Sequence, residues 1–182
     1  EVYLENDKRQ RKATGSYYTP GHIVNYIVHQ TVGPVLDEKF KKVRRPVRDA
    51  QKSHSKLLSY GFSKRDAGRK AFQNHRGVVD QLFDVKVLDP AMGSGHFLVE
   101  TVRYVSERMI DFLNAFPWNP VRELLEQTRR TIQQEMDEQD VTIDPGRLTD
   151  VNLMKRHVLK RCIYGADLNP MAAPLAPLSR PP

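Results

Sequence analysis

Cysteine and long apolar runs are both scarce in this sequence, and their scarcity excludes several classes of protein. Cys162 is the single cysteine among 182 residues, which excludes a disulfide framework and a zinc site built only of cysteines within this chain. No segment approaches the roughly 18 consecutive apolar residues that a membrane-spanning helix needs. The chain starts at Glu1 without the basic and apolar segments of a secretory signal. We therefore expect a cytoplasmic protein with no membrane partner.

Hydrophobic residues are somewhat scarce too, at 39% of the chain, while charged residues make up 28%. This content is low for a globular protein but argues against full disorder. The length suits one domain with a hydrophobic core and is too short for two large domains.

Acidic residues are nearly absent from one part of the chain, between Lys41 and Arg76. Twelve basic residues lie there and only Asp49 and Asp66 oppose them, so this segment carries a charge of +10 and the rest of the chain −3, for a total of +7. Such a segment favours contact with nucleic-acid phosphates, although a solvated surface would have the same composition. Aromatic residues are too few in it to argue for base stacking.

The spacing of apolar residues in the first half predicts a helix followed by a less regular basic segment. Thr19 and Pro20 suit the N-cap and the first position of a helix that extends to about Gln30. Gly33-Pro34 then predicts an interruption. We expect the basic segment, with Pro46 and Gly61 as breakers, to form either a solvated helical hairpin or a mobile loop.

The second half alternates short apolar runs with helical spacing. Residues 85–88 and 161–167 predict short buried strands. Between them, the spacing of residues 98–116 predicts a strongly amphipathic helix, and residues 120–139 and 151–159 predict two more. Strand, turn, helices and strand in this order predict an α/β fold.

A glycine-rich turn, Asp89-Pro90-Ala91-Met92-Gly93-Ser94-Gly95-His96-Phe97-Leu98, joins the first predicted strand to the amphipathic helix. No lysine stands near Gly95, which excludes a phosphate loop, and the dinucleotide fingerprint would need a third glycine after Gly95. An acid at a strand tip followed by an open turn suits a cationic ligand that contains a nucleoside. An ordinary glycine-rich turn between a strand and a helix is the alternative.

This turn resembles motif I of S-adenosylmethionine-dependent DNA adenine-N6 methyltransferases, in the version found in large type II restriction-modification and phage-defence enzymes. Two further segments agree in order. Gly15-Ser16-Tyr17-Tyr18-Thr19-Pro20 is similar to motif X of that family, and Tyr164-Gly165-Ala166-Asp167-Leu168-Asn169-Pro170-Met171-Ala172 is similar to motif II. The resemblance implies a partial Rossmann-like S-adenosylmethionine-dependent methyltransferase fold with helical insertions. It also implies S-adenosylmethionine as cofactor and duplex DNA with an adenine target as partner.

The resemblance assigns roles to eight residues. It implies that Asp167 binds the ribose hydroxyls and that Asp89 lies near the methionine amino group. The remaining residues would form the turn that faces the cofactor and the wall of its pocket: Ala91, Gly93 and Gly95 in the turn, and Tyr18, Thr19 and Pro20 in the wall. Asp89 and Asp167 stand 78 residues apart, a separation that the helices between them explain as an insertion. A solvated acid at a strand end is the alternative for Asp167, and an N-cap is the alternative for Thr19.

One motif of this family is missing from the chain. Adenine-N6 methyltransferases carry Asn, Asp or Ser before Pro-Pro and an aromatic residue, which receives the extruded base. Asp89-Pro90, Asn119-Pro120 and Asn169-Pro170 lack the second proline and the aromatic residue, so we assign no catalytic residue. Prolines at 174, 177, 181 and 182 replace the helix expected at the end, and we expect a truncated or frame-shifted gene end.

We therefore divide the chain into three segments. Residues 1–40 hold the motif X helix, residues 41–84 form the basic insert, and residues 85–182 form a truncated cofactor-binding core. The expected function is the S-adenosylmethionine-binding part of a DNA adenine-N6 methyltransferase, whose partners include DNA and the remainder of the methyltransferase or a restriction-system subunit. A non-catalytic basic remnant, which binds nucleic acid or serves in assembly, is the alternative.

Overall fold

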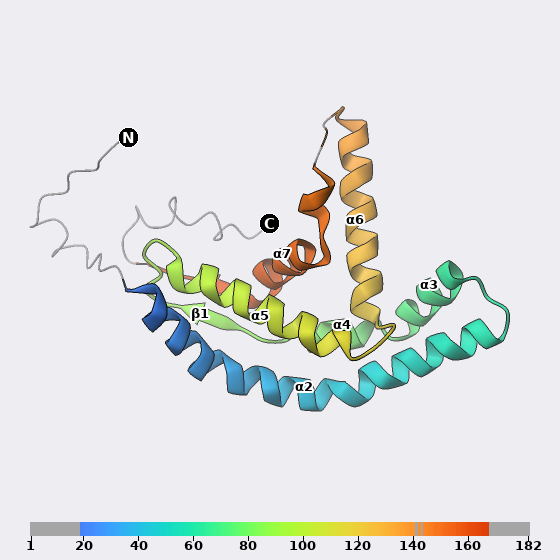
Figure 1. Ribbon diagram of the computed structural model, residues 1–182, viewed down its shortest axis with the longest axis horizontal. Helices are drawn as coiled ribbons and strands as arrows, with labels where there is room; N and C mark the ends of the chain where they lie inside the picture. The colour runs from blue at the N-terminus through green and yellow to red at the C-terminus, as the bar shows by residue number, and fades with distance from the viewer. Residues whose placement is uncertain (1–18, 141, 143, 168–182) are drawn as a thin grey trace, which may run out of the picture.

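A single helix of 39 residues, α2 (Gly21–Ser59), forms the base along which the other elements are arranged. Figure 1 shows α2 as a long bowed helix, with α5 along its first half and α3 folded back along its second half. The structure, a computed structural model, describes residues 19–140, 142 and 144–167. Tyr18, most of motif X and the proline-rich end at 168–182 lie outside the described residues.

The predicted interruptions of α2 are wrong, because a buried apolar stripe continues through both prolines. Pro34 and Pro46 lie inside the helix, which does not end at Gln30. The buried side chains recur every three or four residues along one face: Val24, Val28, Val32, Leu36, Phe40, Val43, Val47 and Ala50. A proline inside a helix costs about 3 kcal/mol, whereas burial of one large apolar side chain contributes about 1.5–3 kcal/mol. The stripe therefore outweighs the two prolines.

The start of α2 also differs from the prediction by one residue. Pro20 is the N-cap, its carbonyl accepts the first helical bonds from Ile23 N (2.9 Å) and Val24 N (3.1 Å), and no side chain caps the helix. Thr19 is therefore not the N-cap.

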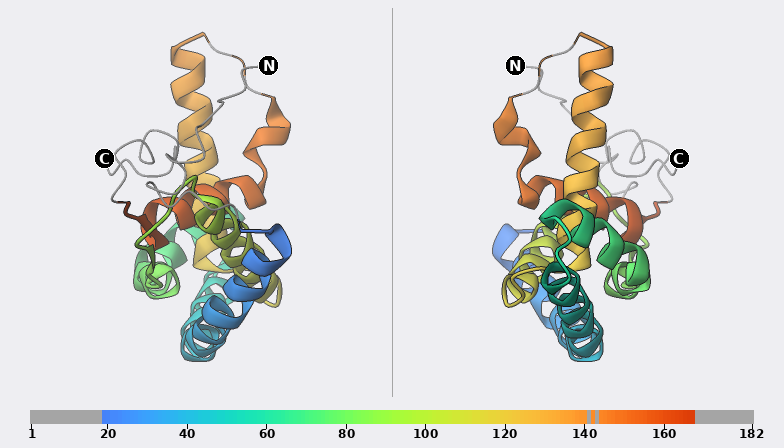
Figure 2. Two further views of the ribbon diagram at one scale, coloured as in Figure 1. Left: turned by 90° about the vertical axis from the view of Figure 1, so that its left-hand side faces the viewer. Right: turned by 90° about the vertical axis from the view of Figure 1, so that its right-hand side faces the viewer.

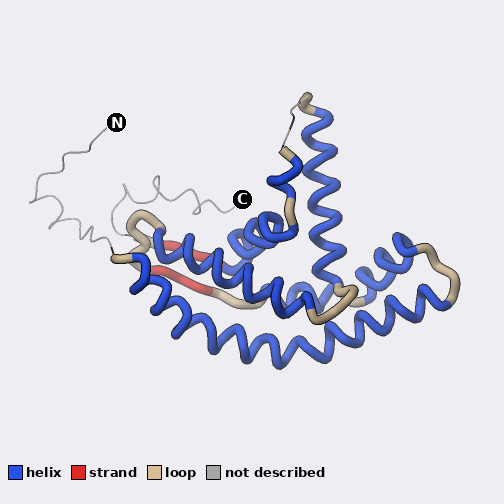
Figure 3. Tube along the Cα trace, in the orientation of Figure 1, coloured by secondary structure: helices blue, strands red, loops and turns tan. Residues whose placement is uncertain are grey.

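The basic segment contains a helical hairpin, one of its two predicted forms. α2 ends at Ser59, the chain turns at Gly61 with a φ of 86°, and α3 (Lys64–Asn74) returns along α2 (Figure 3). Ser63 caps α3 by accepting a hydrogen bond from the backbone N–H of Asp66 at 3.1 Å. α4 (Arg76–Phe83) then leads to the first strand. Apolar residues on the inner side of α3 and α4 pack into the same core as the α2 stripe.

The predicted α/β, Rossmann-like fold is wrong. Among the described residues the only strands are β1 (Val87–Asp89) and β2 (Ile163–Gly165), which pair in parallel with Val87 opposite Ile163 and Asp89 opposite Gly165. Nearly all the remaining regular structure is helical. A four-residue apolar run contains too little periodicity to give the extent of a strand or the size of a sheet. The second predicted strand was also too long, because residues 161–162 belong to α7.

The three helices predicted in the second half are confirmed. α5 (His96–Asn114) packs along α2, α6 (Pro120–Glu138) begins at the capping residue Asn119, and α7 (Asp150–Cys162) packs against α5 and ends at β2. A short 3₁₀ helix, η1 (Pro145–Leu148), precedes α7. Figure 2 shows α6 projecting away from the base formed by α2. Buried residues from every helix except η1 form one continuous apolar core, and no helix among the described residues is long and apolar enough to cross a membrane.

Candidate functional site

The glycine-rich turn joins β1 to α5 and depends on two glycines with left-handed backbone conformations. Gly93 has a φ of 51° and Gly95 a φ of 79°. Gly95 is the N-cap of α5, and its N–H donates a hydrogen bond to the carbonyl of Met92 at 2.7 Å. L residues with a side chain rarely adopt this conformation, so the two glycines let the chain turn sharply from the strand into the helix.

The turn exposes backbone to solvent at Gly93. A Cβ atom placed there would meet no other atom within 4 Å, and Ala91 and Ser94 on either side are exposed. Met92, by contrast, is buried and anchors the turn to the core. The arrangement leaves room for a ligand to approach the main chain closely.

Asp89 shapes the beginning of the turn. Its side chain is half-buried at the end of β1, and its Oδ1 accepts a hydrogen bond from the backbone N–H of Ala91 at 3.0 Å. This short-range bond is typical of an Asp at a turn. The carboxylate therefore lies beside Ala91, at the side of the turn that precedes Gly93.

Asp167 contacts the turn directly, although it stands 74 residues after Gly93. Its Oδ2 accepts a hydrogen bond from the backbone N–H of Gly93 at 2.8 Å. Two backbone hydrogen bonds hold the strand ends together: Ala166 N–H donates to Asp89 O at 2.9 Å, and Met92 N–H donates to Ala166 O at 3.1 Å. The parallel pairing of β1 and β2 thus brings the two acids of the sequence analysis to the same edge of the turn.

Gly165 is a positioning residue to which no sequence pattern assigned a role. A Cβ atom there would clash with the sulfur of Met92 and would lie 2.8 Å from Cδ1 of Leu98. The absence of a side chain lets β2 approach the turn and the first residues of α5. The sequence signal for this role was its position directly before Ala166 and Asp167, near the end of the predicted strand 161–167.

Of the residues similar to motif X, Thr19 and Pro20 are described, and they lie just before α2. Thr19 is half-buried and Pro20 is exposed, while Tyr18 lies outside the described residues. The first half of α2 packs along α5, where the ring of His29 stacks on Tyr104 with centroids 4.1 Å apart. Thr19 and Pro20 therefore lie directly before α2, the helix that runs beside α5.

Cys162 is a core residue, and its environment does not suit a nucleophile. Its side chain is buried and its thiol donates a hydrogen bond to the carbonyl of Phe83 at 3.4 Å. Burial raises the pKa of this thiol to about 11, because the thiolate would lose its hydration. At neutral pH the group is the neutral thiol, which is a poor nucleophile.

Comparison with known proteins gives one informative similarity. Over 103 residues, 53% of this chain, the sequence is 32% identical to a protein of Methanocaldococcus jannaschii named "Putative type II restriction enzyme and methyltransferase RM.MjaORFECS2P". The matched region spans 8% of that protein's length. No protein-family model matches the chain, and no solved structure matches it. The chain is thus similar, over about half its length, to a protein named for restriction and methyl transfer.

Proposed function

We propose that this chain is the S-adenosylmethionine-binding part of a DNA adenine-N6 methyltransferase that belongs to a restriction-modification or phage-defence system. The observation that carries the proposal is the hydrogen bond from Gly93 to Asp167, which joins the open glycine turn to an acid at the end of the neighbouring strand. The similarity to the archaeal protein supports the restriction-modification part. The adenine-N6 part rests on the three ordered sequence motifs.

The residues at the turn have the chemistry that this cofactor requires. S-adenosylmethionine carries a ribose diol, an amino group, a carboxylate and a cationic sulfonium. A carboxylate has about four acceptor positions, so an Asp167 that holds Gly93 can also accept hydrogen bonds from a diol. Asp89 supplies a negative charge for the amino group, and the open space at Gly93 admits a ligand that contacts backbone. Ala91 is exposed beside this space, whereas Gly95 is buried and shapes the turn from beneath. Tyr18, Thr19 and Pro20 are proposed to form the pocket wall.

When bound, the cofactor would supply an activated methyl group on its sulfonium. The proposed work of this chain is to bind and orient the cofactor: Asp167 fixes the ribose, Asp89 attracts the amino group, and the turn from Ala91 to Gly95 sets how closely the cofactor approaches the backbone. No catalytic residue is assigned.

Isothermal titration with S-adenosylmethionine tests the proposal. We expect Asp167→Ala to weaken binding by about 1.5–3 kcal/mol, the scale for a lost charged hydrogen-bond partner. Asp167→Asn keeps an oxygen for the Gly93 N–H but loses the charge, so we expect a smaller but measurable loss.

The matched control is Asp111→Asn, which makes the same change on an exposed face of α5 and should leave the affinity unaltered. Equal affinities for the wild type and both Asp167 variants would refute the ribose assignment. Absence of any heat of binding in the wild type would refute the cofactor.

We further expect the 182-residue chain alone to transfer no methyl group to DNA. None of its X-Pro pairs is followed by a proline and an aromatic residue, so nothing in its sequence corresponds to the pocket for an extruded adenine. A tritiated-methyl transfer assay on adenine-containing duplex checks this. Transfer above the no-protein control, abolished by Gly93→Trp, would show that this chain carries a catalytic motif of another form.

A further inference from the structure

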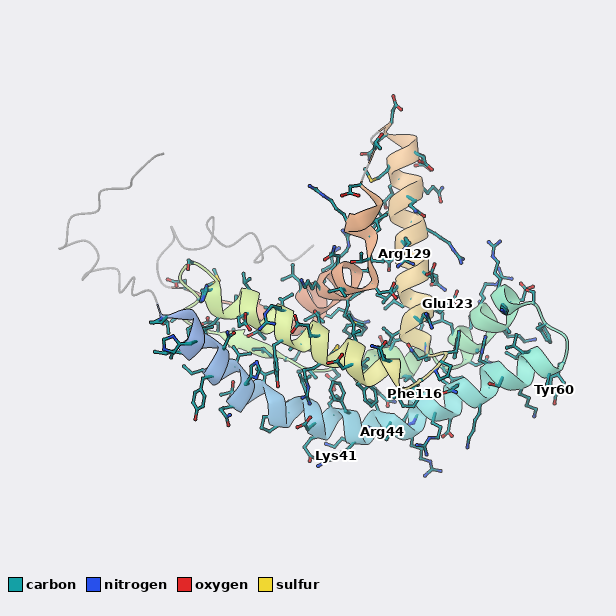
Figure 4. The ribbon with its side chains drawn as sticks, in the orientation of Figure 1. Lys41, Arg44, Tyr60, Phe116, Glu123 and Arg129 are labelled. Atoms are coloured by element: carbon teal, nitrogen blue, oxygen red, sulfur yellow. The ribbon has the colours of Figure 1, made fainter. Side chains whose placement is uncertain are left out.

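A basic hollow lies between the middle of α2 and the C-terminal end of α5. It has a volume of about 410 Å³, and its walls include Arg44, Arg48, Lys52 and Ser55 from α2 and Phe116 just beyond α5. Figure 4 shows Arg44 and Phe116 where the end of α5 passes over α2. Phe116 is buried, so it closes the floor of the hollow and offers no free ring face for stacking on a base.

The hollow contains three cations and no carboxylate. Among the described residues, none of the three basic side chains that line it forms an ion pair, whereas Lys41 and Arg45 on the same helix pair with Glu38 and Asp49. The guanidinium of Arg44 lies over the Phe112 ring, 5.5 Å from its centroid, a contact that steadies its position. Uncompensated like charges in one hollow repel each other, and an anion placed between them relieves this repulsion.

A second hollow, which shares Arg44 with the first, differs from it in charge. It has a similar volume of about 420 Å³, but Asp37 and Asp111 line it together with Lys41, Arg44 and Arg108. Arg108 also pairs with Asp37. Because two carboxylates offset two of its three cations, this second hollow attracts an anion less strongly than the first. Of the two hollows, the one beside Phe116 is therefore the more positive.

The arrangement of the three cations fits a polymer of phosphates better than a single phosphate. Arg44, Arg48 and Lys52 follow each other at intervals of four residues, so they form a row about 12 Å long on one helical face. Along the same length, one strand of duplex DNA presents three to four phosphates, at about 3.4 Å of axis each. The 19 residues of α5 separate this row from the glycine turn by roughly 28 Å, so the hollow is not part of the proposed cofactor site.

We propose that this hollow binds the phosphodiester backbone of DNA, with Arg44, Arg48 and Lys52 on consecutive phosphates of one strand. The proposal takes DNA as the nucleic acid from the proposed function and adds the surface that holds it. The contact is to the backbone and carries no base specificity.

Fluorescence anisotropy with a labelled 20-base-pair duplex, in the absence of S-adenosylmethionine, tests the proposal on the 182-residue chain. We expect the triple variant Arg44→Gln/Arg48→Gln/Lys52→Gln to bind at least tenfold more weakly than wild type. The slope of log affinity against log salt should fall by about 2–3, because each lost phosphate contact removes about 0.9. The control, Lys42→Gln/Arg45→Gln/Lys56→Gln, removes the same charge from exposed residues of α2 that do not line the hollow.

A pair of single variants tests the same proposal in case the triple variant does not fold. Ser55→Glu places a negative charge at the hollow, and Ser59→Glu places the same charge one turn further along α2. We expect only Ser55→Glu to weaken duplex binding clearly. Equal effects of the two triple variants, or of the two Ser→Glu variants, would overturn the assignment to this hollow. Displacement of the duplex by millimolar inorganic phosphate would overturn the polymer as ligand and show a single-anion site.

These outcomes are separable from a failure of the proposed function. The assay contains no cofactor, and Asp167→Asn, which changes the glycine turn and leaves the hollow intact, should bind the duplex like wild type. A chain that binds the duplex but no S-adenosylmethionine would retain this inference and lose the proposed function. A chain that binds S-adenosylmethionine but no duplex would do the reverse.

Discussion

At Gly165 the second strand passes so close to the turn that no side chain fits between them. We expect Gly165→Ala to destabilise the fold by about 1–3 kcal/mol, because the added methyl group must displace Met92 or Leu98 in a packed core. Urea unfolding followed by circular dichroism measures this. The control is Gly77→Ala in α4, where nothing lies within 4 Å of the new atom. That change should stabilise by up to about 1 kcal/mol, since alanine favours helices. Equal effects at the two glycines would contradict the close approach at Gly165.

Because the pKa of Cys162 is raised in the folded protein, we expect the protein to lose stability in alkali. Its pKa is about 11 in the folded protein, above the ordinary value of 9.0, because the thiol is buried. Between pH 9 and pH 11 the unfolded chain has released this proton while the folded chain retains it, so the folded state becomes less stable as the pH rises. The decline is about 1.36 kcal/mol per pH unit in that window.

Unfolding free energies at pH 8, 9, 10 and 11 for wild type and Cys162→Ala isolate this contribution. The variant lacks the thiol, so the difference between the two proteins should shrink from pH 9 upward. A constant difference across the whole range would contradict a buried, neutral thiol.

Residue patterns located the candidate site better than they described its geometry. Asp89, Gly93 and Asp167 were assigned to the site through the resemblance to three motifs, and the structure brings them into one hydrogen-bonded group, while their roles toward a cofactor stay predictions. The sequence could not show that Asp167 holds the Gly93 N–H, because 74 residues of helix and turn have to return the chain to that point. Gly165 escaped notice because a close approach depends on both surfaces, and only one of them is visible in a local pattern.

Among the elements, α2 shows where local rules fail. Proline is a reliable helix breaker only when little packing opposes it, and here Val47 and Ala50 continue the buried stripe past Pro46. The same three-and-four spacing was present in the sequence, but the density of basic residues concealed it. The helices α5, α6 and α7 were predictable because their apolar faces and capping residues agree. The size of the sheet was not, since strand pairing depends on segments far apart in the chain.

Replacement of Pro46 by alanine should stabilise the protein. The change removes a residue that costs about 3 kcal/mol inside a helix, while the unfolded chain gains up to about 1 kcal/mol of entropy. We therefore expect a net stabilisation of about 1–2 kcal/mol in urea unfolding. Pro120→Ala is the matched control, because Pro120 occupies the first turn of α6, where proline is favoured, and is buried. It should be destabilising. A loss of stability in Pro46→Ala would mean that the bend of α2 requires the proline.

At the scale of the whole molecule, α5 connects the two proposed sites. The helix begins at the glycine turn and ends beside the basic hollow, and it packs on both α2 and α7 along its length. A rigid helix between two binding surfaces fixes their separation, at roughly 28 Å here, or about eight base pairs of duplex. Most basic residues of the 41–76 segment form no ion pair among the described residues, so under the proposal it is their position that sets Arg44, Arg48 and Lys52 apart: they line one hollow at the end of α5.

The apolar core runs without interruption from Val24 on α2 to Ile163 on β2, so we expect the described residues to unfold in one step. Two residues can serve as probes of unfolding in different parts of the structure. Trp118, the single tryptophan, stacks on His54 of α2 with ring centroids 4.5 Å apart, and Cys162, the single cysteine, lies buried beside β2. Tryptophan fluorescence, thiol labelling and circular dichroism should therefore give the same urea midpoint. This comparison also tests the division into segments 1–40, 41–84 and 85–182, because segments with separate stability would unfold separately.

Labelling of Cys162 at a lower urea concentration than the change in Trp118 fluorescence would show that the strand pair and its turn open before the α2–α3 hairpin. The candidate cofactor site would then be the less stable end of the molecule.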